Sequence, residues 1–208
     1  MPDLNLPPYK KIVTDLPVLD HTIVVVDKNE ILEKRLNSEK YETTLFKIKN
    51  CYQITRKKLL TYKYKNQEEK CIDILLWGYP RGGRGHNISL AISKISKVSK
   101  VASHKNQTWE KYLKGFKGTG VGVATASKFA YFYKLEFEGQ KALILDQQIA
   151  DVLESGVWGK KLSAVGKYSE WSNRYVKYLS EMNALAGNIG CTGDQLELAL
   201  YLFGKAFR

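Results

Sequence analysis

The sequence contains few residues of the kinds that build disulfide frameworks or metal centres. Its three cysteines, Cys51, Cys71 and Cys191, are scattered and odd in number, which excludes a disulfide framework and an iron–sulfur cluster signature. Its three histidines show no spacing typical of metal ligands. We therefore expect the protein to bind neither a metal nor another cofactor.

Long apolar runs are also missing. No stretch approaches the roughly 18 residues that a helix needs to cross a bilayer. The first residues, MPDLNLPPYKK, lack the basic segment and the apolar block of a secretory signal peptide. Together with the cysteine usage, these absences lead us to expect a protein of the reducing cytoplasm and exclude an integral membrane protein.

Acidic residues are scarce relative to basic ones. Lys and Arg total 33 against 21 Asp and Glu, which leaves a net charge of +12 over 208 residues. Such a balance indicates a polyanionic partner, most often nucleic acid; an anionic membrane surface or a merely soluble basic protein are the alternatives. The apolar content of 44% is that of an ordinary globular protein, long enough for one domain.

Strand signals are thin throughout, so the sequence predicts a mostly α protein. Residues 1–20 hold four of the five prolines, which indicates an extended arm. A short apolar run at 23–26 precedes a short helix that Asp27 or Asn29 can cap. Residues 40–64 show apolar residues at mixed spacings, and we interpret this segment as helix.

The C-terminal half carries clearer helix signals. An apolar stripe at helical spacing predicts a core-facing helix: Trp171, Tyr175, Leu179, Met182 and Leu185. A further helix is predicted after Asp146, and a last one begins after Thr192 or Asp194, because these residue types are favoured N-caps. A small turn is predicted at Glu138 and Gly139.

Lysine recurs every third residue at Lys94, Lys97 and Lys100. Three residues turn about 300° on an α-helix, so these lysines fan around one side of a helix, opposite an apolar stripe that drifts with them. A helix of this kind can face the phosphates of a nucleic acid or form an ordinary solvated face.

The segment GTGVGVATASKFAYF, residues 118–132, begins with Gly118, Gly120 and Gly122. Its spacing fails the G-x-G-x-x-G fingerprint, and a nucleotide-binding enzyme would also need a strand before Gly118, where TWEKYLKGF indicates a helix. Glycines at positive φ can aim backbone N–H groups at a DNA phosphate, and the dipole of the next helix and Lys117 add positive potential. A tight turn between two packed helices is the alternative.

The stretch GTGVGVATASKFAYFY, with KALILDQQIADVL after it, resembles the helix–hairpin–helix and following aspartate of the DNA glycosylase superfamily that carries this motif. It is most similar to bacterial proteins with the 8-oxoguanine DNA glycosylase fold. The blocks DILLWGYPRGGRG and DQLELALYLFG are similar to that group too, so the resemblance covers residues 72–208. It implies a helix–hairpin–helix bundle with little β structure, in which 71–208 form the glycosylase-like region and 1–70 an N-terminal arm and helical lobe, together one compact unit.

The resemblance also implies a chemistry. Family members flip a damaged base out of the duplex and cut its N-glycosidic bond, and the bifunctional ones use a lysine amine as nucleophile at C1′. Lys128 and Asp146, 18 residues apart, are then the candidate nucleophile and the aspartate that stabilises charge on the sugar. The family lysine usually follows the last glycine by about two residues, at Ala124 here, and Lys128 lies one helical turn later on nearly the same face.

Each candidate residue has a structural alternative. Lys128 can be a helix lysine that extends over aromatic rings to reach solvent, and Asp146 can serve only as a helix N-cap. Arg81 and Arg84 lie in a glycine-rich loop after Trp77 that can reach DNA or simply be exposed to solvent.

The residues and the resemblance together predict a DNA glycosylase, with AP-lyase activity if Lys128 is the nucleophile. Its expected substrate is a modified or oxidised purine, such as 8-oxoguanine, in double-stranded DNA, and we expect a nucleoid-associated monomer. Phe203 and Phe207 on the last helix either wall the base pocket or pack in the core. A non-catalytic DNA-binding protein, for example in bacterial defence, is the alternative that Ala124 favours.

Overall fold

The computed structural model describes residues 10–26, 46–48, 51–81, 86–155 and 168–204. Helices dominate these ranges, and the strands form two small antiparallel sheets, so the prediction of a mostly α protein with little β structure is confirmed. The helices are α1 (Lys10–Thr14), η1 (Val18–Asp20), α3 (Arg56–Thr61), α4 (Gln67–Gly78), α5 (His86–Ser93), α6 (Ile95–Ala102), α7 (Trp109–Gly115), α8 (Val123–Phe132), α9 (Gln147–Glu154), η3 (Tyr168–Glu170), α10 (Trp171–Ile189) and α11 (Gly193–Phe203). The strands are β1 (Thr22–Val26), β2 (Phe46–Ile48), β3 (Cys51–Thr55), β4 (Glu136–Phe137) and β5 (Gln140–Lys141).

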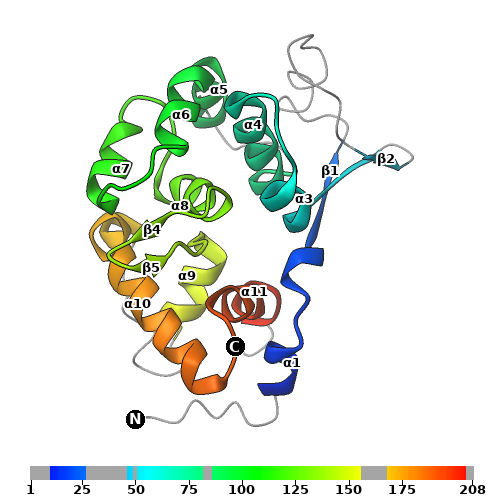
Figure 1. Cartoon of the computed structure of the whole chain (residues 1–208), viewed down its shortest axis with the longest axis vertical. Helices are drawn as coiled ribbons and strands as arrows, with labels where there is room; N and C mark the ends of the chain where they lie inside the picture. The colour runs from blue at the N-terminus through cyan, green and yellow to red at the C-terminus, as the bar shows by residue number, and fades with distance from the viewer. Residues whose placement is uncertain (1–9, 27–45, 49–50, 82–85, 156–167, 205–208) are drawn as a thin grey trace.

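Helix α8 occupies the middle of the molecule. In Figure 1 it lies among α4, α6, α7 and α9, and it packs directly against α4 and α6. All of its side chains from Thr125 to Phe132 are buried, including that of Lys128. The alternation of small and aromatic residues in ASKFAYF lets neighbouring helices approach α8 closely on several sides.

The N-terminal part contains a sheet where the sequence predicted helix and arm. Strands β1, β3 and β2 pair in that order, all antiparallel, so the helix expected over 40–64 is wrong for 46–48 and 51–55 and right only for α3. Tyr52 and Ile54 are buried while Gln53 and Thr55 are half-buried, an alternation with period two that fits a strand covered on one face. The extended arm is wrong for 10–14 and 18–20, which are helical, and the helix expected after Asp27 or Asn29 lies outside the described residues.

The lysine-rich segment forms two helices, because the chain breaks at Lys94 between α5 and α6 (φ −110°, ψ 26°). On one continuous helix, apolar residues at every third position would rotate gradually away from the core. The break at Lys94 reorients the second helix, so its apolar residues face the core again. Ile92, Ile95 and Val98 are consequently all buried, while Lys94 remains exposed.

The C-terminal predictions are largely confirmed. Helix α10 buries the expected stripe except for the partly buried Leu185. Its Tyr175 ring stacks on Trp109 of α7 with ring centroids 3.9 Å apart. Thr192 is the N-cap of α11, in a capping box with Gln195. Glu138 and Gly139, with φ of 51° and 74°, form the turn between β4 and β5.

Candidate active site and DNA-binding face

The glycine segment is the turn between α7 and α8. Gly118 and Gly120 have φ of 74° and 77°, the left-handed region that favours glycine. A Cβ on Gly120 would lie 2.1 Å from the carbonyl oxygen of Asn87, so only glycine fits there. Because helix α7 precedes Gly118, the alternative of a nucleotide-binding enzyme with a strand before the glycines is wrong.

Two lysines of the repeat hold this turn from outside. The Lys94 ammonium donates to the carbonyl of Gly118 at 2.8 Å, and the Lys97 ammonium donates to that of Lys117 at 3.1 Å. Carbonyl oxygens would repel a phosphate, and the two ammonium groups neutralise them. The lysine repeat therefore supports the turn as well as adding charge to it.

Three backbone N–H groups of the turn have no hydrogen-bond acceptor in the described part of the chain. Within the described part of the chain, no hydrogen bond occupies the backbone N–H of Gly118, Gly120 or Gly122. Gly122 caps α8 and has no side chain to accept the N–H groups of the first turn of this helix. The arrangement can bind an anion.

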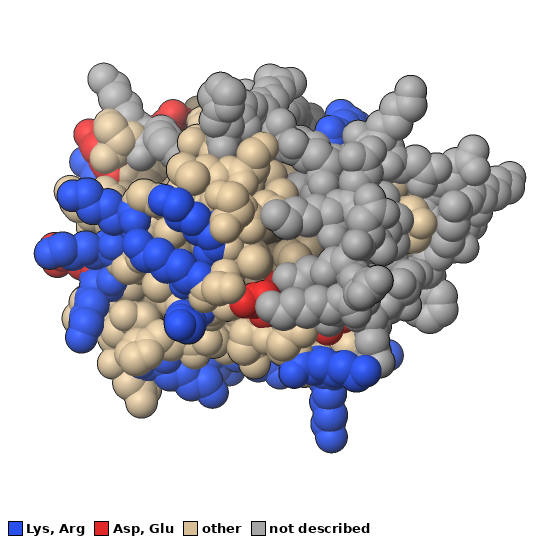
Figure 2. All heavy atoms as spheres, turned by 90° about the horizontal axis from the view of Figure 1, so that it is seen from above, with Lys and Arg blue, Asp and Glu red and all other residues tan. Residues whose placement is uncertain are grey.

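The helices near the turn carry many exposed lysines. Figure 2 shows Lys and Arg side chains gathered on one side of the face seen from above, the side where Figure 1 places α6 and α7. The exposed lysines of this region are Lys94, Lys97, Lys100, Lys111, Lys114 and Lys117. Arg81 is exposed after α4, and Arg84 lies outside the described residues.

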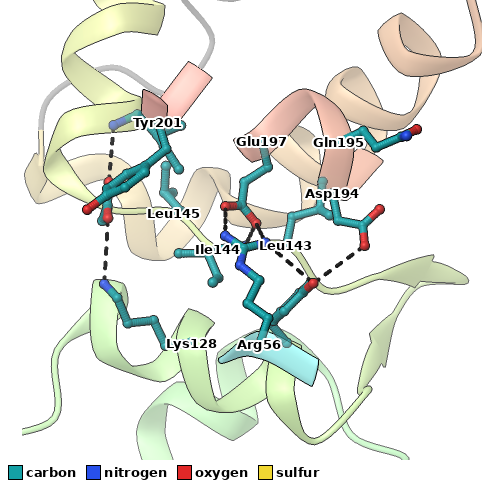
Figure 3. A network of polar contacts seen from close by, with 12 residues as sticks. Arg56, Lys128, Leu143, Ile144, Leu145, Asp194, Gln195, Glu197 and Tyr201 are labelled. Atoms are coloured by element: carbon teal, nitrogen blue, oxygen red, sulfur yellow. Dashed lines mark hydrogen bonds and ion pairs between the residues drawn. The ribbon is translucent and has the colours of Figure 1, made fainter. Parts of the chain in front are cut away.

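Lys128 and Asp146 come together from two different elements. Lys128 projects from α8, Asp146 precedes α9, and the Lys128 Nζ lies 3.8 Å from the Asp146 Oδ2 (Figure 3). The Lys128 side chain is only 7% exposed and the Asp146 side chain 19%. The structure thus brings together the two residues that the sequence singled out for catalysis.

Asp146 divides its two carboxylate oxygens between two tasks. Its Oδ1 accepts the backbone N–H of Ile149 at 3.1 Å and so caps α9, while its Oδ2 faces Lys128. Asp146 is therefore the N-cap of α9 through Oδ1, and its Oδ2 remains available to interact with Lys128.

A single serine ties the two elements together. The Ser127 Oγ accepts the backbone N–H of Leu145 at 3.0 Å. Because Ser127 precedes Lys128 and Leu145 precedes Asp146, this buried bond fixes the spacing of the candidate pair. Sequence inspection missed Ser127, and its adjacency to Lys128 was the one available signal.

The segment before Asp146 is held from its other side by tyrosines of α10. The Tyr175 hydroxyl donates to the carbonyl of Leu143 at 2.6 Å, and the Tyr178 hydroxyl donates to that of Ile144 at 2.8 Å. This irregular stretch is buried, and these bonds satisfy its carbonyls where no sheet does so. The position of Asp146 is therefore rigidly defined.

A buried ion pair lies beside the candidate pair (Figure 3). The Arg56 Nη2 is 2.7 Å from Glu197 Oε1, and both side chains are only 1% exposed. Glu197 Oε2 also accepts the backbone N–H of Ile144 at 3.3 Å. Burial lowers the pKa of Arg56, but the charges and hydrogen bonds of Glu197 and Tyr131 outweigh it and hold that pKa above its ordinary value.

These groups line one small cavity of about 40 Å³. Its walls include Arg56, Trp77, Gly78, Lys128, Asp146 and Glu197. Gly78 is required for the path of the lysine, since a Cβ there would lie 2.9 Å from Lys128 Cδ. Phe203 is partly buried against the core, whereas Phe207 lies outside the described residues.

A larger hollow of about 560 Å³ is lined by Tyr131 and lies between the β4–β5 hairpin and the start of α11. Lys134, Lys141 and Asp194 line it, but neither Lys128 nor Asp146 does. Its size alone does not make it the site of chemistry, and the small cavity holds the ionisable groups that converge.

Across the described ranges, no group of three or more His, Cys, Asp or Glu side chains could hold a metal ion. No helix in these ranges has the length and apolar content to cross a membrane.

Comparison with known proteins places the chain in a family. No curated protein and no solved structure matches it. One family model, described as "Putative 8-oxoguanine DNA glycosylase OGG-like protein", matches residues 18–201. This match spans nearly the whole chain and includes the glycine turn, Lys128, Asp146 and the Arg56–Glu197 pair. The protein therefore belongs to this OGG-like family.

Proposed function

We propose that the protein is a DNA glycosylase that excises an oxidised or modified purine, such as 8-oxoguanine, from double-stranded DNA. One observation carries this proposal: the Lys128 amine and the Asp146 carboxylate converge at 3.8 Å in the wall of one cavity, in a chain of an OGG-like family. A flipped base must meet a nucleophile and a stabilising charge in one enclosed place.

Lys128 is the proposed nucleophile. Its neutral amine attacks C1′ of the deoxyribose, the bond from C1′ to the base nitrogen breaks, and the base leaves with the bonding electrons and takes up a proton. The attached amine then passes a proton to O4′ as the C1′–O4′ bond breaks, which opens the sugar and forms the Schiff base. β-Elimination follows, in which C2′ loses a proton and the C3′–O bond breaks. Asp146 Oδ2 stabilises the positive charge that develops on the sugar, and it is close enough to accept the proton from Lys128.

The glycine turn is the proposed helix–hairpin–helix contact to the DNA backbone. Unoccupied N–H groups of Gly118, Gly120 and Gly122 would bind a phosphate, with Lys117 beside them. Arg81 after α4 is a second proposed contact. Binding of this kind is independent of sequence and weakens as salt rises, because it releases counterions from the duplex. We place this activity at the nucleoid and in a monomer.

Ala124 supports a second candidate function. The position that usually holds the family lysine carries Ala124, so a protein that binds DNA without cutting it, for example in defence against modified phage DNA, would keep the hairpin and lack turnover. Lys128 reaches the cavity from one turn further along the same helix, which favours catalysis over this alternative.

The proposal is tested with two duplexes, one carrying 8-oxoguanine and one carrying an abasic site, each incubated with and without borohydride. We expect release of the oxidised base from the first and a covalent protein–DNA adduct on both. If a panel of lesions gives neither base release nor adduct while the duplex is bound tightly, the protein is a non-catalytic DNA binder.

A further inference from the structure

Two side chains that line one cavity, and a histidine that packs against one of them, each carry a buried polar atom without a hydrogen-bond partner. Among the described residues, Arg56 Nε, Trp77 Nε1 and His21 Nδ1 are all shielded from solvent and unpartnered. Arg56 and Trp77 line the cavity that also holds Lys128 and Asp146. Buried polar groups are nearly always hydrogen-bonded in native proteins, so such a cluster at one place indicates a ligand.

The two donors are firmly placed. Arg56 is 1% exposed and Trp77 6%, and the guanidinium carbon lies 5.2 Å from the centroid of the Trp77 ring. His21 packs edge-on against Trp77, with ring centroids 5.4 Å apart. Rigid side chains of this kind hold a donor in one direction and favour a ligand whose acceptors match it.

The charge of the cavity wall identifies the ligand class. Arg56 Nη2 is paired with Glu197, and Nη1 lies 3.4 Å from the Tyr131 hydroxyl, so the guanidinium charge is balanced and only Nε is unpartnered. A balanced, buried pair offers little to a phosphate, which would bring an uncompensated charge. A neutral heterocycle with acceptor atoms satisfies the donors at a lower desolvation cost.

We infer that Arg56 and Trp77 select the extruded base, by donating their Nε–H and Nε1–H to acceptor atoms on its edge. This inference rests on the proposed glycosylase function. Guanine and 8-oxoguanine both present O6 as an acceptor, whereas adenine and 8-oxoadenine present an amino donor at position 6. Two N–H donors therefore favour a purine with an oxo group at position 6 and disfavour one with an amino group there. As it stands the cavity of about 40 Å³ has room for no more than a few water molecules, so it widens when a base enters.

The test uses Trp77→Phe, which keeps an aromatic ring and removes the donor. Trp109→Phe is the matched control, since Trp109 is equally buried but donates its Nε1–H to the Ser172 carbonyl, away from the cavity. The measured quantity is the ratio of single-turnover release rates for 8-oxoguanine and 8-oxoadenine in the same duplex. Borohydride trapping on an abasic site measures the lysine chemistry without any base.

We expect Trp77→Phe to lower the ratio by roughly three- to tenfold, the effect of one lost hydrogen bond, with abasic-site trapping unchanged. Trp109→Phe leaves the ratio at its wild-type value. An unchanged ratio in Trp77→Phe, or equal losses in base release and trapping, would overturn the inference while the glycosylase function stands. Equal release of both bases by the wild type would also overturn it. A wild type that neither releases a base nor is trapped contradicts the proposed function itself.

Discussion

The side chain of Lys128 passes directly over Gly78 at the end of α4. A Cβ on Gly78 would lie 2.9 Å from Lys128 Cδ and 3.3 Å from its Cε. The last turn of one helix thus leaves space for the stem of a lysine on another, and this space lets the amine reach Asp146.

Gly78→Ala should therefore move the amine without unfolding the protein. Alanine is favourable in a helix, and the stem of lysine can shift, so we expect a change in unfolding free energy below about 1 kcal/mol. Borohydride trapping should fall tenfold or more, because small misplacements of reacting groups are costly. Gly187→Ala on α10, where nothing lies within 4 Å of the added Cβ, is the control and should be trapped like the wild type. Equal trapping in both variants would show that Gly78 does not position Lys128.

Asp146→Asn separates the two tasks of this side chain. Asparagine caps a helix about as well as aspartate, so the unfolding free energy should stay within about 0.5 kcal/mol of the wild type. The charge that faces Lys128 is lost, and we expect single-turnover base release to fall roughly 100-fold or more. Asp146→Ala should reduce base release by a similar factor. It should also lower the unfolding free energy by about 1 kcal/mol, because alanine cannot cap α9. Full activity in Asp146→Asn would restrict Asp146 to capping α9.

Gly118 and Gly139 form a matched pair for testing whether the glycine turn between α7 and α8 contacts DNA. Both have φ of 74°, and an added Cβ would meet nothing within 4 Å at either position. Alanine at φ above zero costs roughly 1–2 kcal/mol, so both variants should be destabilised about equally. Only Gly118→Ala should weaken binding to an undamaged duplex, because its methyl group would lie between the hairpin N–H groups and a phosphate. Fluorescence anisotropy at one salt concentration measures this, and equal affinities would contradict the hairpin contact.

His21 should make the fold sensitive to mild acid. Burial and the nearby charge of Arg56 lower the pKa of His21 from 6.5 to about 4. Between these values the unfolded chain takes up a proton and the folded chain does not, so stability falls as the pH decreases from about 6.5 to about 4. His21→Phe retains the ring contacts with Trp77 and Tyr201 and should lose less stability over this window. Urea unfolding at several pH values measures the difference, and parallel curves would contradict it.

The features predicted best from the sequence were those that depend only on residues close together in the chain. The glycine turn, the cap at Asp146 and the turn at Gly139 depend on φ preferences and caps that act over a few residues. The apolar stripe of α10 followed from helical periodicity alone. The pairing of Lys128 with Asp146, by contrast, came from the resemblance to DNA glycosylases.

Contacts between segments that are far apart in the sequence could not be predicted from such local signals. Arg56 and Glu197 are 141 residues apart, and neither has a local pattern that marks it for burial. Strand β3 was missed because its alternation is only five residues long and runs directly into α3. Trp77 appeared only as a neighbour of a loop, since its unpartnered nitrogen depends on α3 and β1 packing around it.

The most direct test of the account is the identity of the lysine that forms the covalent adduct. The wild type is trapped with borohydride on abasic-site DNA and digested, and the modified peptide is sequenced by mass spectrometry. We predict that the modification lies on Lys128 and that Lys128→Ala gives no adduct. Lys117→Ala should bind DNA more weakly and still form the adduct on Lys128 once the DNA is saturating. An adduct on another lysine, or a full yield from Lys128→Ala, would contradict the assignment of Lys128 as the nucleophile.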